Sequence, residues 1–327
     1  MKRTHLLLSS LVLSTTLAGT VAFVAPASAD AGGRPTAYTL QGDAVDAANP
    51  AGSKFEGIGA DERRGLFYVS EVTGGEIHRG SVGSAATQEW LAGNGTDGRF
   101  TARGITVDDA GRIYVAGGPN GIGTDRPDLW VYSPTGELLA ALRAPGTDVF
   151  LNDVAIGTDG AAYFTNSNDA QVFRVADDGA GWNASLWADA TATIERRTGF
   201  NLGGIVLTAD RSAFVVAQGN AGLLWRFDLA TQQATRVETG GADLVNADGL
   251  VRQGDRLTVV RNFSKMIATL SLADDGSSAA LVAQQQSSAD RVLTTAKALR
   301  GRILYVDSKF DEPVASGPYE VITNPTR

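Results

Sequence analysis

The sequence predicts an all-β fold, a six-bladed β-propeller whose four-stranded blades surround a central channel. Three observations predict it: one unit recurs six times, each copy has the pattern of a hairpin, and further strand-like segments lie between the copies. The unit is a short apolar strand, a turn that contains Asp or Gly, and a second apolar strand, as in "LNDVAIGTDGAAYFTNS". Its copies occupy residues 55–72, 102–118, 151–167, 202–218, 247–262 and 294–309.

The copies recur at the period of a propeller blade, about 45–50 residues. The first inward apolar residues of the copies are Ile58, Ile105, Val154, Ile205, Leu250 and Ala296. Apolar residues alternate at period two on either side of turns such as "GTDG", which is typical of hairpins. Segments such as "QVFRVADDG" and "KMIATLSLADDG" supply two more strands per unit, which makes four. A helical solenoid is excluded because Gly, Asp and β-branched residues interrupt every possible helical run.

The N-terminal residues 1–29 have the pattern of a secretory signal peptide. Lys2 and Arg3 precede an uncharged apolar run, and "ASA" ends at Ala29, directly before Asp30. We expect cleavage near Ala29–Asp30 and a secreted, extracellular protein.

The remainder is expected to form a short flexible N-terminal segment, residues 30–36, and one propeller domain, residues 37–323. The strand-like "AYTL", residues 37–40, is expected to help close the ring. After cleavage about 298 residues remain, enough for one large domain. The segment 188–200 interrupts the pattern as a loop that would form either a lid over the channel mouth or a longer blade edge.

Composition excludes several classes of function. Without the signal peptide the net charge is about −10, which argues against a nucleic-acid partner or an anionic membrane. The absence of cysteine excludes thiol catalysis and thiolate metal sites. Only His78 would remain, so histidine-rich zinc or copper sites are excluded as well, and we expect His78 to be an exposed strand residue. We expect the protein to bind a small molecule and to be a monomer.

One polar position recurs two residues before the apolar marker, at the end of the strand that faces the channel. Its occupants in the first five copies are Glu56, Arg103, Asn152, Gly203 and Asp248, and the sixth copy contributes Thr295, which stands directly before its marker Ala296. Equivalent positions of a propeller converge on one axis, so these side chains are expected to meet. Asp153 faces the other way and is expected to bind backbone amides of the neighbouring blade.

Glu56, Asn152 and Asp248 offer three oxygen ligands, a set that suits a hard cation. One divalent cation is expected, Ca²⁺ first, with Mg²⁺, Mn²⁺ or Zn²⁺ as alternatives. Two carboxylates in a closed channel repel each other unless a cation or Arg103 neutralises them. A solvated polar channel in which Arg103 forms the salt bridges is the other interpretation.

Four stretches, "FEGIG", "LNDVAIGTDGAAYFT", "FNLGGIVLTAD" and "NADGL", resemble the signature strands of the senescence-marker-protein/gluconolactonase family, the regucalcin-like six-bladed propellers. The resemblance spans roughly residues 50–310. It implies a channel cation held by a Glu, two Asn and an Asp, and hydrolysis of sugar lactones. It places these ligands on Glu56, Asn152 and Asp248, whereas Gly203 stands where the family has its other Asn. Asn201, two residues earlier, or a water molecule would then complete the set.

The predicted function is that of a secreted, divalent-metal-dependent hydrolase of small cyclic esters. Asp248 is the candidate general base. Arg103 would hold a substrate oxygen or neutralise a carboxylate. The further candidates for substrate binding are Asn166, Asn220 and Asn262.

Two other functions stay open at this point. One is a non-catalytic propeller that binds a ligand or protein at its channel face. The other is a related propeller chemistry, phosphotriester hydrolysis or a condensation like that of strictosidine synthase.

Overall fold

The computed structural model describes residues 29–30, 32–47, 49–119 and 126–327. This part of the chain is all-β apart from one 3-10 turn, η1 (Thr96–Gly98). Within these residues no helix has the length and hydropathy needed to span a bilayer. The predicted signal peptide lies outside the described residues except for Ala29.

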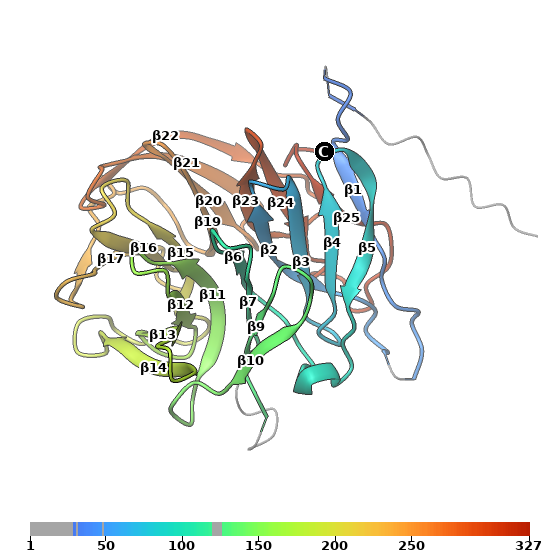
Figure 1. Cartoon of the computed structure of the whole chain (residues 1–327). Helices are drawn as coiled ribbons and strands as arrows, with labels where there is room; N and C mark the ends of the chain where they lie inside the picture. Colours follow the sequence, from blue (N-terminus) through green and yellow to red (C-terminus); the bar gives the residue numbers. More distant parts are fainter. Residues whose placement is uncertain (1–28, 31, 48, 120–125) are drawn as a thin grey trace, which may run out of the picture.

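The strands of the described residues form five sheets (Figure 1). An eight-stranded sheet has the order β2 (Phe55–Asp61), β3 (Leu66–Glu71), β4 (Ile77–Ser81), β5 (Ser84–Leu91), β1 (Ala37–Leu40), β25 (Tyr319–Ile322), β24 (Arg302–Asp307) and β23 (Leu293–Leu299). The next sheet has the order β10 (Leu138–Leu142), β9 (Leu129–Tyr132), β7 (Ile113–Ala116) and β6 (Ile105–Val107).

The remaining three sheets follow in chain order. One contains β14 (Trp182–Asp189), β13 (Gln171–Asp177), β12 (Ala162–Asn166), β11 (Phe150–Ile156) and β8 (Gly118–Pro119). The second contains β15 (Leu202–Leu207), β16 (Ala213–Gln218), β17 (Leu223–Asp228) and β18 (Ala234–Arg236). The third contains β19 (Ala247–Gln253), β20 (Arg256–Arg261), β21 (Met266–Leu272) and β22 (Ala279–Gln286).

All six predicted hairpins are present, as β2–β3, β6–β7, β11–β12, β15–β16, β19–β20 and β23–β24. Every apolar marker of the repeat is at most 1% exposed. The first strands of the hairpins contact one another in the cyclic order β2, β6, β11, β15, β19, β23 and back to β2. Figure 1 shows the last strands, β23 and β24, returning beside β2.

The two ends of the ordered chain meet in the eight-stranded sheet. Ala37 to Leu40 pair antiparallel with β25, and Thr39 also pairs in parallel with Ala86 of β5. The predicted strand "AYTL" therefore links the final strands of the chain to the first hairpin, as expected of a strand that closes a ring.

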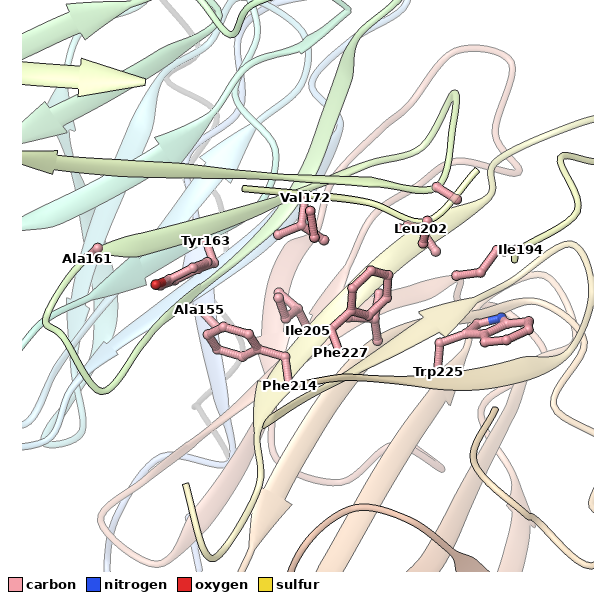
Figure 2. Packing of buried hydrophobic residues seen from close by; sticks show 14 residues of the cluster. Ala155, Ala161, Tyr163, Val172, Ile194, Leu202, Ile205, Phe214, Trp225 and Phe227 are labelled. Atoms are coloured by element: carbon pink, nitrogen blue, oxygen red, sulfur yellow. The ribbon is translucent and has the colours of Figure 1, made fainter. Parts of the chain in front are cut away.

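The core lies between successive sheets, because inner strands such as β11 and β16 are buried on both faces, whereas outer strands such as β22 are mostly exposed. Figure 2 shows one such layer, in which side chains of β11 to β13 pack against those of β15 to β17. Tyr163 lies with its ring centroid 4.8 Å from that of Phe214, and Ile205 and Val172 fill the same layer. Burial of aromatic and branched side chains at such contacts is the main stabilising term of the fold.

Close backbone approach between inner strands explains the glycine before the apolar marker. The Gly104 amide donates a hydrogen bond of 2.7 Å to the carbonyl oxygen of Asn152 on the next inner strand. A Cβ atom at Gly104 would lie 2.3 Å from that oxygen and 2.4 Å from the Asp153 Cα. Both contacts are to backbone, which cannot move aside cheaply.

Gly104→Ala is therefore expected to lower the free energy of unfolding by about 3 kcal/mol, since the methyl group forces the two inner strands apart. Gly83→Ala is the control, because a Cβ atom there meets nothing within 4 Å. Chemical denaturation of both variants measures the difference. Equal stabilities would show that the inner strands lie further apart than described.

Candidate active site

The candidate site lies where the inner strands begin, at irregularities in their ladders. Leu151 pairs with Asn166 and Val154 with Phe164, so three steps on β11 face two on β12. The same shift precedes the apolar marker in β2, β15, β19 and β23. A bulge re-aims the side chains that it contains. The side chains of Asn152 and of its counterparts within these bulges therefore do not follow the in-and-out alternation of a regular strand.

The structure brings most of the predicted residues to one cavity of about 490 Å³. The residues singled out by the sequence that line it are Glu56, Arg103, Asn152, Asn201, Gly203, Asn220, Asp248 and Asn262. A second, narrow hollow of about 10 Å³ is lined by Glu56, Asn152 and Asp248 together with Asp153, Thr295 and the inner glycines. Glu56, Asn152 and Asp248 are the three residues that line both, so they form the floor of the large cavity.

Glu56 forms an ion pair with Arg103, through the Arg103 Nη1 and the Glu56 Oε2. Both side chains are largely buried, at 7% and 16% exposed. Burial raises the pKa of Glu56, and the Arg103 guanidinium opposes that rise. Arg103 thus performs one of its two predicted roles, the neutralisation of a channel carboxylate.

Within the described part of the chain, Asp248 has an amide partner but no cationic one in direct contact. Asn262 Nδ2 donates a hydrogen bond of 2.8 Å to Asp248 Oδ2. Burial and the charge of Glu56 raise the pKa of Asp248 well above its ordinary value, while the bond from Asn262 works in the opposite direction. The floor thus holds the carboxyl groups of Glu56 and Asp248 beside one guanidinium, and a cation there would favour the ionised form of Asp248.

The space in front of Gly203 is bounded by two of the predicted ligand oxygens. A Cβ atom at Gly203 would lie 3.8 Å from Asn152 Oδ1 and 3.8 Å from Asp248 Oδ1. The adjacent hollow of about 10 Å³ has room for about one water-sized sphere. The oxygen donors and the size of the hollow both fit a hard divalent cation.

The amide of Asn201 is used within its own loop. Asn201 Oδ1 accepts hydrogen bonds from the Arg197 amide at 2.9 Å and from Asn220 Nδ2 at 3.1 Å, and Asn201 Nδ2 donates to the Arg197 carbonyl. Asn220 also donates to the carbonyl oxygens of Arg197 and Thr198. Asn201 and Asn220 both line the cavity wall. The hydrogen bonds within the loop satisfy both the oxygen and the nitrogen of the Asn201 amide, so a metal ion is not needed to explain its position.

The structure places Asn166 outside the cavity lining. Asn166 is fully buried, and its Oδ1 accepts bonds from the amides of Phe150 at 2.9 Å and Asn168 at 3.0 Å. It therefore holds the start of β11 rather than facing a ligand. Asp153 has its predicted structural role, because its Oδ2 accepts a 3.2 Å bond from the Ile205 amide on the neighbouring inner strand.

The prediction for His78 was wrong. His78 is 2% exposed, packs edge-on against Phe55, and lies with Nε2 3.3 Å from Glu71 Oε2. Strand β4 is covered on both faces at this point, since Ile77 is also fully buried. His78 does not line the cavity.

An acidic cluster lies beside His78. One carboxylate oxygen from each of Asp43, Glu71 and Glu76 lies within 4.8 Å of the others. Burial raises the pKa of Glu76 to about 7. This group is separate from the cavity floor and provides a control for any cation-binding experiment.

The sequence interpretation missed the aromatic residues of the cavity. Phe200, Phe263 and Phe310 line it, and Phe150 supports Arg103 with its ring centroid 4.5 Å from the guanidinium carbon. Each of the three lining residues directly follows or precedes a polar residue of the motif strands, such as Asn201 or Asn262. The segment 188–200 also reaches the site at its end, because Thr198 to Phe200 form part of the cavity wall.

Comparison with solved structures identifies proteins of similar fold. A gluconolactonase from Xanthomonas campestris is 15% identical, with a TM-score of 0.59 over 92% of this chain and 99% of that one. The calcium-binding protein regucalcin from Agrobacterium tumefaciens is 15% identical, with a TM-score of 0.56 over 84% and 92%. Virginiamycin B lyase from Staphylococcus aureus is 12% identical, with a TM-score of 0.57 over 83% and 80%.

At these identities the likeness shows the fold alone, an all-β architecture similar to that of these proteins. No family model and no curated protein matches the sequence.

Proposed function

We propose that the protein is a secreted, divalent-metal-dependent hydrolase of small cyclic esters, built as one six-bladed propeller over residues 37–323. The six blades follow if the eight-stranded sheet is divided at the Thr39–Ala86 pair, which gives β2 to β5 and β23, β24, β25 with β1. The observation that carries the proposal is the cavity floor, where Asn152 and Asp248 flank the open space at Gly203 beside Glu56.

In this proposal Glu56, Asn152 and Asp248 hold one cation, with Ca²⁺ the first choice. Water takes the place in front of Gly203, because Asn201 is bonded into its loop. When bound, the cation would polarise the ester carbonyl. The gluconolactonase and the calcium-binding regucalcin among the structural neighbours support this choice of chemistry and ion.

Asp248 would act as the general base. Its carboxylate takes a proton from water, whose oxygen bonds to the carbonyl carbon while the ring C–O bond breaks. The same proton then passes to the ring oxygen, so the product is a hydroxy acid. Asn262 holds Asp248 in place through its 2.8 Å bond, and Arg103 would hold a substrate oxygen at the floor.

A panel of lactones tests the proposal, assayed by proton release in the presence of Ca²⁺ and of a chelator. Hydrolysis of at least one lactone that the chelator abolishes is the expected result. Failure to hydrolyse any of them, with every candidate metal supplied, would reject the hydrolase.

The second candidate is a propeller that binds a ligand without catalysis. The glycine at position 203 and the ion pair of Arg103 with Glu56 favour it, because both reduce the ligands available to a cation. Ligand binding to a protein that hydrolyses no lactone would support this candidate.

Restoring a fourth oxygen ligand is expected to strengthen cation binding. Gly203→Asn introduces an amide where a Cβ atom makes only ordinary contacts, the nearest at 3.6 Å from the Asp248 carbonyl oxygen. We expect about tenfold tighter Ca²⁺ binding, since one more protein oxygen replaces water. Calorimetric titration measures it, with Gly83→Asn as the control. Unchanged or weaker binding would place the cation elsewhere.

A further inference from the structure

Three phenylalanines from separate segments surround the mouth of the cavity. Phe200 precedes β15, Phe263 lies in the turn between β20 and β21, and Phe310 follows β24. Phe200 is 57% exposed and Phe263 is 54% exposed. Large apolar side chains gathered in the open at a concave site mark a surface that binds an apolar partner group.

Aromatic packing behind the wall connects Phe200 at the rim to Arg103 at the cavity floor. The Phe200 ring centroid lies 5.2 Å from that of Phe150, and Phe150 in turn lies against the Arg103 guanidinium. Arg103 is the ion-pair partner of Glu56. A ligand whose reactive group reaches the floor would therefore have its remaining atoms along Phe200 and its neighbours.

The polar groups of the same wall are mostly used within the protein. Asn246 Nδ2 donates to Ser264 Oγ at 3.0 Å, and the amide nitrogens of Asn201, Asn220 and Asn262 all donate to protein oxygens. Asn220 Oδ1 is a buried acceptor without a partner among the described residues. Among the described residues, Arg103 Nε is a second buried lining atom without a partner, so away from the carboxylates of the floor few polar atoms are free, a poor match to the many hydroxyl groups of a sugar lactone.

We propose that the substrate is a lactone with an apolar alkyl or aryl substituent, which lies on Phe200 and Phe263 while the ester reaches Asp248. This inference rests on the proposed hydrolase function and narrows its substrate class. The cavity of about 490 Å³ falls in the range of sites for ligands much larger than a single lactone ring.

The test compares kcat/KM for δ-dodecalactone and glucono-δ-lactone in the wild type and in the double variant Phe200→Ser with Phe263→Ser. We expect the wild type to prefer the alkyl lactone at least tenfold. The double variant should lose at least tenfold on the alkyl lactone, mainly through KM, and keep its rate on gluconolactone. Leu281→Ser, an exposed apolar residue on β22, is the control and should change neither rate. Preference for gluconolactone, or an equal loss on both substrates, would overturn the inference.

A binding measurement separates this inference from the hydrolase itself. Calorimetric titration with a non-hydrolysable δ-lactam that carries the same alkyl chain reports on the rim without catalysis. Binding that the double variant loses, in a protein that hydrolyses no lactone, would reject the hydrolase and support an apolar ligand. No binding of the lactam by the wild type would overturn the apolar assignment, whatever the hydrolase assay shows.

Discussion

Asp248→Asn is expected to lower kcat/KM for a hydrolysed lactone by about 10²–10⁴-fold, the usual contribution of a general base. The variant keeps the shape of the side chain and can still accept a hydrogen bond from Asn262. It removes the proton acceptor and one negative charge from the cavity floor. The assay is run at saturating Ca²⁺, so that weaker cation binding does not account for the loss.

Asp255→Asn is the matched control for this variant. Asp255 is exposed and lies in the turn of the same hairpin, at the end opposite to Asp248. Its replacement should leave kcat/KM unchanged. Retention of more than a tenth of the activity by Asp248→Asn would show that another group takes the proton.

Arg103→Met is expected to destabilise the cation-free protein by about 3 kcal/mol, since it leaves the buried Glu56 carboxylate without a partner. Saturating Ca²⁺ should restore most of that loss, because a cation at the floor would neutralise the same carboxylate. Chemical denaturation in chelator and in Ca²⁺ measures both quantities.

Arg256→Met, an exposed arginine at the start of β20, should change stability little in either condition. If Arg103→Met is as stable as the wild type in chelator, the ion pair contributes nothing to the fold. If Ca²⁺ gives the variant no extra protection, the cation does not bind at Glu56.

The repeat was predictable from the sequence because propeller strands follow the period of two with buried branched residues. Ile58 and its counterparts in the other copies show the pattern directly, and each is buried in its predicted hairpin. Asn152 and Asp248 were expected to meet because they hold equivalent positions of the repeat, and both line the cavity.

The contacts of individual side chains depend on features that a periodic pattern does not contain. Asn201 is bonded to a loop whose conformation is set by Arg197 and Asn220, and Asn166 caps backbone amides that no motif indicates. His78 is buried because other segments cover both faces of β4. Phe200 and Phe263 are single residues in loops, and only the folded ring brings them together.

Calorimetric titration of Ca²⁺ into chelator-treated protein tests the central claim most directly, with Asp248→Asn and Glu76→Gln alongside. We predict one site with Kd on the order of 10⁻⁴ M, in the range of extracellular calcium modules. Binding should weaken at least tenfold in Asp248→Asn and persist in Glu76→Gln, which alters only the separate acidic cluster. No binding by the wild type, or binding that Glu76→Gln abolishes and Asp248→Asn leaves intact, would contradict a cation at the cavity floor.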